Sequence, residues 1–118
     1  LDLVGDRWTL LVIRDLGLGG RSRFGELCAS EGIATNILAD RLGRLEDHGV
    51  VVKERDPEDG RKRRYRLTER GKDLLPIVLE MAVWGLEHTV DGVAHRDLIE
   101  GYKSDRAQAL EAIRRGLP

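Results

Sequence analysis

Hydrophobic residues recur at helical spacing near the start of the chain, over residues 7–18. Asp6 is suited to cap the start of this helix, and Gly19-Gly20 would end it. A helix that is apolar on so many sides must bury two faces, so we expect it at the centre of the core or in a dimer interface. The apolar residues 1–4 indicate the end of an earlier helix. The apolar stripe of the helix predicted over residues 7–18 consists of Trp8, Leu11, Val12 and Leu16, and Leu10 and Ile13 widen it.

Two more helices are predicted before residue 50. The sequence RFGELCAS forms a short helix with Phe24, Leu27 and Cys28 turned inward, and residues 31–34 form a turn. The sequence TNILADRLGRLEDHG forms a third, longer helix, with Thr35 as its N-cap and Gly49 as its stop. Its inward stripe is Leu38, Leu42 and Leu45, and its opposite face carries Asn36, Asp40, Gly43, Arg44 and Asp47.

The pattern changes from helical to alternating after Gly49. Residues 50–55, VVVKER, form a short segment that begins with three β-branched residues, which is typical of a strand. The following DPEDG has the composition of a turn. In the following RKRRYRL, Tyr65 and Leu67 share one face, and Arg64 and Arg66 share the other. These residues predict a β-hairpin with a basic tip and a basic return strand.

Helical patterns return after the hairpin. Thr68 is predicted to cap a helix that runs to about residue 90, and DGVA, from Asp91, breaks it. One last amphipathic helix follows. We therefore expect a mainly α protein with a small β-hairpin (α+β), with residues 1–90 as one domain. Residues 91–118 would add a C-terminal helix, for dimerisation or as the start of a further region. The apolar positions of the helix after Thr68 are Leu74, Leu75, Val78, Met81, Ala82 and Trp84. Those of the last helix are Leu98, Ile99, Tyr102, Leu110 and Ile113.

Positive charge is concentrated in the hairpin, although the chain of 118 residues has a net charge of only -1. Residues 51–72 hold nine basic and five acidic residues, whereas acidic residues exceed basic ones on both sides of this segment. Between Arg61 and Arg66, five of six residues are Lys or Arg. Such asymmetry indicates an anionic partner for one edge of the protein.

The order helix, short helix, turn, longer helix and hairpin is that of a helix-turn-helix with a β-wing. The plainer alternative is a small α+β domain whose hairpin is merely solvated. A disordered basic tail is a further alternative, but turn chemistry and the alternating strand with Tyr65 and Leu67 favour a folded hairpin. Double-stranded DNA is the partner that suits this arrangement best, because a helix with small and polar side chains can enter the major groove.

Candidate DNA contacts lie on the third helix and the hairpin. Asn can pair with adenine, Arg with guanine, and Ile can touch a thymine methyl group. The arginines of the third helix could instead form surface ion pairs with Asp40 or Asp47. Because a strand alternates, the basic residues of the hairpin cannot all face DNA. The candidates are Asn36, Ile37, Asp40, Arg41 and Arg44 for bases, Thr35 and Arg23 for phosphates, and Arg61, Lys62, Arg63 and Arg64 for the wing.

Other classes of protein have little support in the sequence. His48, His88 and His95 lie far apart, so no metal or other cofactor is expected, and no catalytic triad or phosphate-binding glycine loop is present. No run of residues is long and apolar enough for a membrane span, and no signal peptide is visible. Cys28 is the only cysteine, which fits a reducing cytoplasm.

The opening LDLVGDRWTLLVIRDLGLGGRSRFGEL resembles the start of HxlR-type winged-helix transcriptional regulators. The segments ILADRLGRLEDHGVV and YRLTERGKDLLPIV continue the resemblance, which covers roughly residues 1–90. The wing DPEDGRKRRYRLTERG is closer to the related MarR type. In that type an Asp-x-Arg unit, matched here by Asp59 and Arg61, orients the Arg toward DNA.

The resemblance implies a homodimer that binds a (pseudo)palindromic operator. We expect a repressor, although the sequence itself does not distinguish repression from activation. Dimerisation through the first helix and the long C-terminal helix would use Trp8, Leu11, Met81 and Trp84, although these residues could also belong to a monomer core. A separate hypothesis is that an apolar crevice between the winged helix and the dimer helices holds a small-molecule effector of unknown identity. HxlR-like proteins usually carry a cysteine just before the segment that opens this chain. Cys28 is a different position and is expected to act as a small buried hydrophobe. The alternative function is a winged helix that binds protein instead of DNA.

Overall fold

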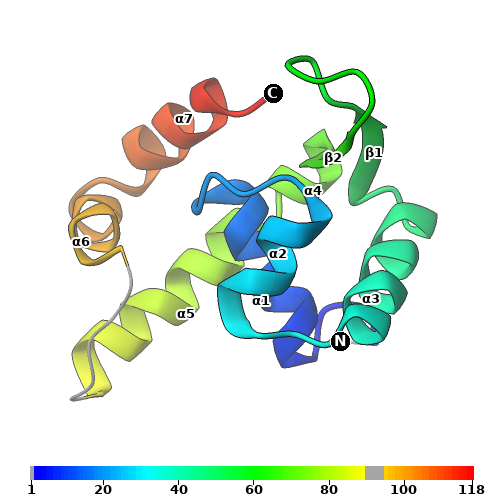
Figure 1. Cartoon of the computed structure of the whole chain (residues 1–118). Coiled ribbons are helices and arrows are strands. Elements are labelled where there is room, and N and C mark those ends of the chain that lie inside the picture. Colours follow the sequence, from blue (N-terminus) through cyan, green and yellow to red (C-terminus); the bar gives the residue numbers. More distant parts are fainter. Residues whose placement is uncertain (1, 90–94) are drawn as a thin grey trace.

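The computed structural model describes residues 2–89 and 95–118 (Figure 1). Helices surround α1, and a two-stranded antiparallel hairpin extends from one side, so the predicted winged helix-turn-helix of the α+β class is confirmed. The elements are α1 (Arg7–Gly17), α2 (Phe24–Glu31), α3 (Thr35–Asp47), β1 (Val51–Arg55), β2 (Arg63–Leu67), α4 (Glu69–Lys72), α5 (Leu75–His88), α6 (Arg96–Ser104) and α7 (Arg106–Gly116).

Helix α1 lies at the centre of the core, as its apolar pattern predicted. Ile13 is fully buried, and α1 packs against α3, α5 and β2. The Asp6 carboxylate caps the helix by accepting hydrogen bonds from the Thr9 backbone N–H at 3.0 Å and the Thr9 hydroxyl at 2.8 Å. Residues 2–4 form a turn and not the end of a helix, and Leu3 and Val4 are partly buried against the core.

Helix α3 buries Leu38, Leu42 and Leu45, as predicted. Its end is also as predicted: Gly49 adopts a φ of 71°, and its N–H donates to the Glu46 carbonyl at 3.0 Å. The start differs by one residue. Ala34 is the N-cap, because its carbonyl accepts the first helical hydrogen bond from the Leu38 N–H at 3.0 Å. Thr35 therefore lies inside the helix and does not cap it.

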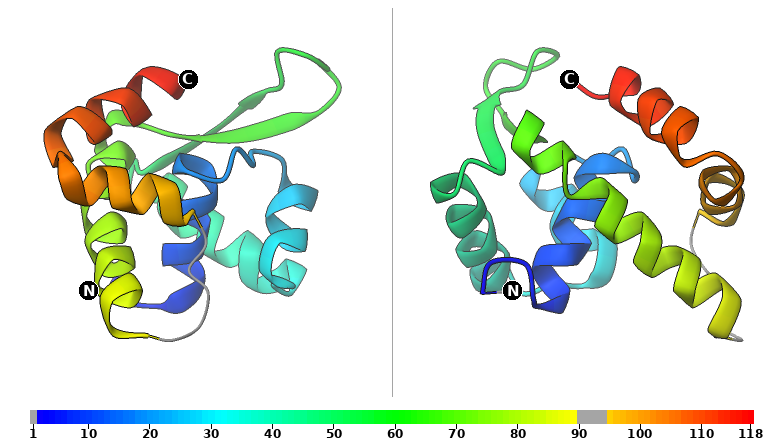
Figure 2. Two further views of the ribbon diagram at one scale, coloured as in Figure 1. Left: turned by 90° about the vertical axis from the view of Figure 1, so that its left-hand side faces the viewer. Right: turned by 180° about the vertical axis from the view of Figure 1, so that it is seen from behind.

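The hairpin pairs Val51 with Leu67 and Arg55 with Arg63 at its two ends. Tyr65 and Leu67 are buried on the face turned toward the core, as the alternation predicted. Figure 2 shows the loop between the strands projecting well beyond the helices. The hairpin thus has one face over the helices and one face that lies outside them.

The predicted helix from Thr68 to about residue 90 is two helices. Thr68 caps α4 as expected, accepting a hydrogen bond from the Gly71 N–H at 3.1 Å. The chain then breaks at Asp73 and Leu74 before α5 begins. Pro76 explains the break, because it has no N–H to donate to the Lys72 carbonyl in a continuous helix. The predicted break DGVA lies outside the described residues.

The last predicted helix is also two helices, which fold back over α5 (Figure 2). Asp105 separates α6 from α7, because its extended backbone ends one helix and its carboxylate caps the next through the Gln108 N–H at 3.2 Å. Ile99 and Tyr102 of α6 pack with Leu79 and Val83 of α5 in a second apolar cluster. Residues 95–118 therefore extend the core of the winged helix.

Candidate nucleic-acid interface

The outward face of α3 presents Asn36 and Asp40, both exposed, together with Gly43 one turn further on. Thr35 is exposed at the start of the same helix, and Ile37 is half-buried against the core. The first turns of α3 therefore offer small and polar side chains to a groove. This is the part of a recognition helix that reads base edges.

The two arginines of α3 are held by the segment before α1. Arg41 donates from Nε to the Asp6 carboxylate at 3.1 Å and from Nη1 to Asp40 at 2.6 Å. Arg44 donates from Nη2 to the Asp2 carbonyl oxygen at 2.6 Å. Both side chains are half-buried in this arrangement. They brace α3 against the N-terminal turn, and they would have to leave these partners to reach a base.

The two faces of the hairpin differ in charge. On the outer face, Glu54 accepts hydrogen bonds from Arg64 Nε at 2.8 Å and from Arg66 Nε at 3.0 Å. The bond from Arg66, followed by that from Arg64, holds the pKa of Glu54 below its ordinary value. Arg64, a predicted wing contact, is thus paired within the protein and points away from α3.

The face turned toward α3 carries Lys53 and Arg55 from β1 and Arg63 from β2. All three are exposed, and within residues 2–89 and 95–118 none of them has an ion-pair partner. The ammonium group of Lys53 lies 5.8 Å from the centre of the Tyr65 ring. Lys53 and Arg55 were not among the predicted DNA contacts. Extending the two-residue alternation from the return strand to VVVKER would have found them.

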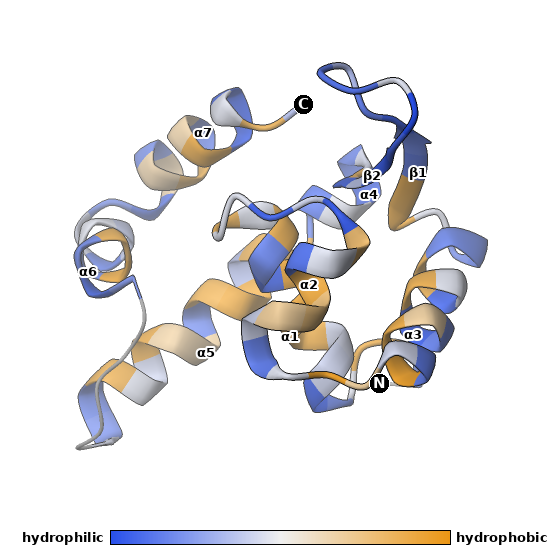
Figure 3. Cartoon of the chain, viewed as in Figure 1, coloured by the Kyte–Doolittle hydropathy of each residue, from blue (hydrophilic) through white to orange (hydrophobic). Residues whose placement is uncertain are grey.

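The tip of the wing projects Arg61 into solvent. Its side chain is 91% exposed, and Asp59 Oδ1 accepts hydrogen bonds from the Arg61 backbone N–H at 3.1 Å and from its Nε at 3.3 Å. The backbone bond, followed by the side-chain bond, lowers the pKa of Asp59. Lys62 is exposed next to it. The Asp-x-Arg unit therefore fixes the base of the Arg61 side chain. Figure 3 shows the hydrophilic character of this tip.

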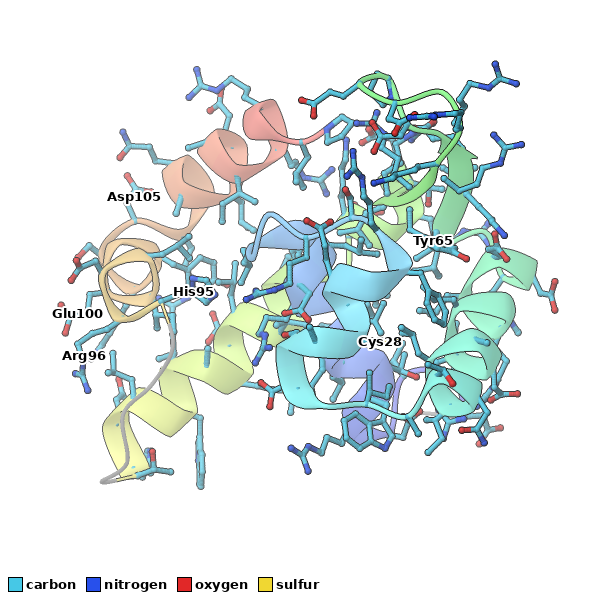
Figure 4. The ribbon with its side chains drawn as sticks, viewed as in Figure 1. Cys28, Tyr65, His95, Arg96, Glu100 and Asp105 are labelled. Carbon is cyan, nitrogen blue, oxygen red and sulfur yellow. The ribbon has the colours of Figure 1, made fainter. Side chains whose placement is uncertain are left out.

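A hollow of about 760 Å³ joins α3 to the charged face of the hairpin. Its apolar lining includes Phe24, Leu42 and Tyr65, and Figure 4 shows Tyr65 between the hairpin and α3. Lys53, Lys62 and Arg63 line the same hollow from the wing, alongside Glu26 and Glu46. Wing cations and the recognition helix therefore border one open space.

Arg23, predicted to contact phosphate, is paired with the base of the wing. Its Nε lies 2.7 Å from Asp56 Oδ2. The backbone N–H groups at the start of α2 are also occupied, because Glu26 Oε1 accepts from Arg23 N at 2.9 Å and from Ser22 N at 3.2 Å. This helix start is neutralised by a carboxylate of the protein itself.

A separate apolar surface lies on α5. Met81 is 55% and Trp84 is 61% exposed, and Ile77, which the sequence analysis did not single out, is exposed beside them. A hollow of about 390 Å³ runs between this helix and α1, lined by Leu10, Leu11, Val78, Met81 and Ala82 with Arg7 and Arg14. Trp8 is half-buried and packs against the core.

Other sites have no support in the described part of the chain. Among residues 2–89 and 95–118, no His, Cys, Asp or Glu residues gather into a group that could hold a metal ion. In the same residues, no helix has the length and apolar character needed to cross a membrane. Cys28, labelled in Figure 4, is half-buried on α2 and packs against the core.

The exposed face of α3 and the cationic wing beside it define a winged helix-turn-helix of the kind found in transcriptional regulators. The chain belongs to the HxlR-like helix-turn-helix family, whose model matches residues 3–92. It is 40% identical over 88 residues to an HTH-type transcriptional regulator of Mycobacterium tuberculosis, Rv3095, covering 75% of this chain and 55% of that protein. The chain thus spans about half the length of this relative.

Solved structures show the same architecture. PA1607, whose crystal structure is known, is 42% identical in sequence to this chain. The two structures match with a TM-score of 0.70, over 77% of this chain and 63% of the PA1607 chain. A protein assigned to the MarR family from Porphyromonas gingivalis is 34% identical, with a TM-score of 0.64 over 74% of this chain and 85% of that one. The family and these relatives are regulators and not enzymes, in agreement with the sequence analysis.

Proposed function

We propose that this protein is a sequence-specific DNA-binding transcriptional repressor that acts as a homodimer on a palindromic operator. Residues 35–48 enter the major groove, and the wing, residues 55–66, lies on the DNA backbone or in the minor groove. The observation that carries the proposal is the shared hollow, because α3 and the cations of the hairpin border it together. A DNA strand passing there would meet both elements at once.

Base readout is assigned to the start of α3. Asn36 is exposed and can pair with adenine, while Asp40 can accept from cytosine N4 or orient Arg41, to which it is already bonded. Thr35 is exposed where a phosphate would approach the helix start. Ile37 is half-buried, so its contact with a thymine methyl would use only its exposed edge.

Backbone contact is assigned to the inner face and tip of the wing. Lys53, Arg55 and Arg63 share one face, and Lys62 and Arg61 continue it toward the tip. Within residues 2–89 and 95–118, Lys53, Arg55 and Arg63 have no ion-pair partner, so no internal pair has to break before they contact phosphate. Arg64 is paired with Glu54, so we assign it a smaller role.

The homodimer is supported by the surface of α5. Three large apolar side chains, Ile77, Met81 and Trp84, are exposed at helical spacing, an arrangement that monomeric proteins rarely leave uncovered. The hollow between α5 and α1 continues this surface to Leu11. A two-fold dimer through α1 and α5 would bury it and would place two recognition helices on one duplex.

Asn36→Ala tests the assignment of base readout. Affinity for the preferred site should fall by about 1–3 kcal/mol, and the preference at a single base pair should be lost. The assay is DNA selection from a random library, followed by anisotropy titration. Gln108→Ala, an exposed amide on α7, is the matched control and should leave both unchanged. Equal losses on every sequence would contradict base readout by Asn36. No duplex binding by the wild-type protein would favour a protein-binding winged helix.

A further inference from the structure

The base of the wing contains a buried carboxylate, Asp56, which is only 5% exposed. Its Oδ2 atom accepts from Arg23 Nε at 2.7 Å, and its Oδ1 atom accepts from the backbone N–H groups of Glu58 at 2.8 Å and Asp59 at 3.3 Å. The Asp56 N–H donates across the hairpin to the Lys62 carbonyl at 3.0 Å. One residue thus joins the start of α2, the turn of the wing and the end of its loop.

This carboxylate stays ionised under ordinary conditions. The hydrogen bond from Arg23, followed by that from the Glu58 N–H, lowers the pKa of Asp56 to about 2. A hydrogen bond between two charged groups at 2.7 Å is short and strongly directional. Arg23 and Asp56 therefore form an ion pair at neutral pH.

A second link lies next to the pair. The Tyr65 N–H donates to the Ser22 carbonyl at 2.7 Å, so β2 is joined to the residue before Arg23. The hairpin is consequently held at two adjacent points of the segment that leads into α2. Since α2 packs on α3, the wing and the recognition helix are mechanically connected through this segment.

We propose that Arg23 and Asp56 are a positioning pair for DNA binding, which sets the angle of the wing relative to α3. This inference rests on the proposed function and deepens it. With the pair intact, the cations of the inner face and the base-reading residues meet DNA as one rigid surface. Without it, the projecting loop would have to be ordered on binding, at a cost in affinity. Arg23 then acts through Asp56 and not as a phosphate ligand.

The direction in which Asp56→Asn changes the affinity for DNA distinguishes this positioning role from a purely electrostatic effect. Asp56→Asn removes a negative charge near DNA, so a purely electrostatic effect would strengthen binding. Loss of the positioning pair should instead weaken DNA binding by about tenfold, which lies in the range of coupling energies measured between residues in direct contact. Glu58→Gln is the matched control: it makes the same charge change two residues away, on an exposed side chain. It should bind DNA as tightly as wild type or slightly more tightly.

A double-mutant cycle tests whether Arg23 acts through Asp56 or contacts DNA phosphate directly. If the pair acts as a unit, Arg23→Met and Asp56→Asn should each weaken binding, and the double variant should be no weaker than the worse single variant. If Arg23→Met alone loses affinity while Asp56→Asn binds like the Glu58→Gln control, Arg23 is a phosphate ligand and the proposal is overturned. Arg23→Met removes the less buried partner, so it also serves if Asp56→Asn fails to fold.

Wing mobility in the free protein gives a readout without DNA. Amide order parameters of residues 61–63 should fall from roughly 0.85 to below about 0.6 in either variant of the pair and stay unchanged in Glu58→Gln. Unchanged order parameters in both pair variants would overturn the inference. If wild-type protein bound no DNA, the proposed function would fail, whereas these order parameters would still decide whether the pair holds the wing.

Discussion

The charge difference between the two hairpin faces makes a quantitative prediction about salt dependence. Arg63 lies on the inner face, and no ion-pair partner for it occurs in the described parts of the chain, whereas Arg64 is bonded to Glu54 on the outer face. The two residues are neighbours, carry the same charge and belong to the same strand. Arg63→Ala should therefore remove one phosphate contact, whereas Arg64→Ala should remove one internal ion pair.

The size of the effect follows from counterion release. Each phosphate contact contributes about -0.9 to the slope of log K against log salt concentration. Over a fourfold change in salt, from about 50 to about 200 mM, one contact accounts for roughly a 3.5-fold change in affinity. Arg63→Ala should reduce the magnitude of the slope by about 0.9, and Arg64→Ala should change it by close to zero.

Fluorescence anisotropy titrations of a labelled duplex at three or four salt concentrations would measure both slopes. Wild-type protein and the two variants need only be compared on the same DNA, so the absolute affinity does not matter. Circular dichroism would confirm that both variants retain their helices. If Arg64→Ala flattened the slope as much as Arg63→Ala, the assignment of the inner face as the DNA-facing one would be wrong.

Three further predictions concern assembly and stability. Trp84→Ala should shift the protein from dimer to monomer at tens of micromolar, as measured by light scattering, and an unchanged mass would exclude this surface as the interface. Gly71→Ala should destabilise the fold by about 1–3 kcal/mol in urea unfolding, because an added Cβ would lie 2.2 Å from the Val50 carbonyl oxygen. The folded-state pKa of Asp56, about 2, lies below its ordinary value, so its stabilising effect is present above about pH 4 and is lost as the pH falls toward 2. The difference in Tm between wild type and Asp56→Asn should shrink accordingly, and a constant difference would contradict the ion pair.

Local signals in the sequence predicted most of the fold. The stripe of Leu38, Leu42 and Leu45 identified the recognition helix, and Gly49 marked its end, because helical spacing and a left-handed C-terminal residue depend on neighbours only. Thr68 was equally visible as a cap. The two helix breaks were missed for different reasons. Pro76 is a recognisable signal for the first break, whereas an aspartate such as Asp105 is equally compatible with an exposed helix.

The site was harder to predict, because it depends on contacts between distant residues. Arg23 and Asp56 are 33 residues apart, and nothing in their neighbourhoods indicates that they pair. The partners of Arg41 and Arg44, Asp6 and the Asp2 carbonyl, are similarly remote. A sequence shows which residues are charged, whereas the structure shows which of these charges already have partners. That difference moves the predicted wing contacts from Arg64 toward the β1 strand.

Selection of bound duplexes from a random DNA library, with the wild-type protein, tests the central claim most directly. We expect enrichment of an inverted repeat whose half-sites lie about one helical turn apart or a multiple of it, as two recognition helices of a symmetric dimer require. Recovery of single half-sites would contradict the dimer on a palindromic operator. The absence of any enriched duplex would contradict sequence-specific DNA binding itself.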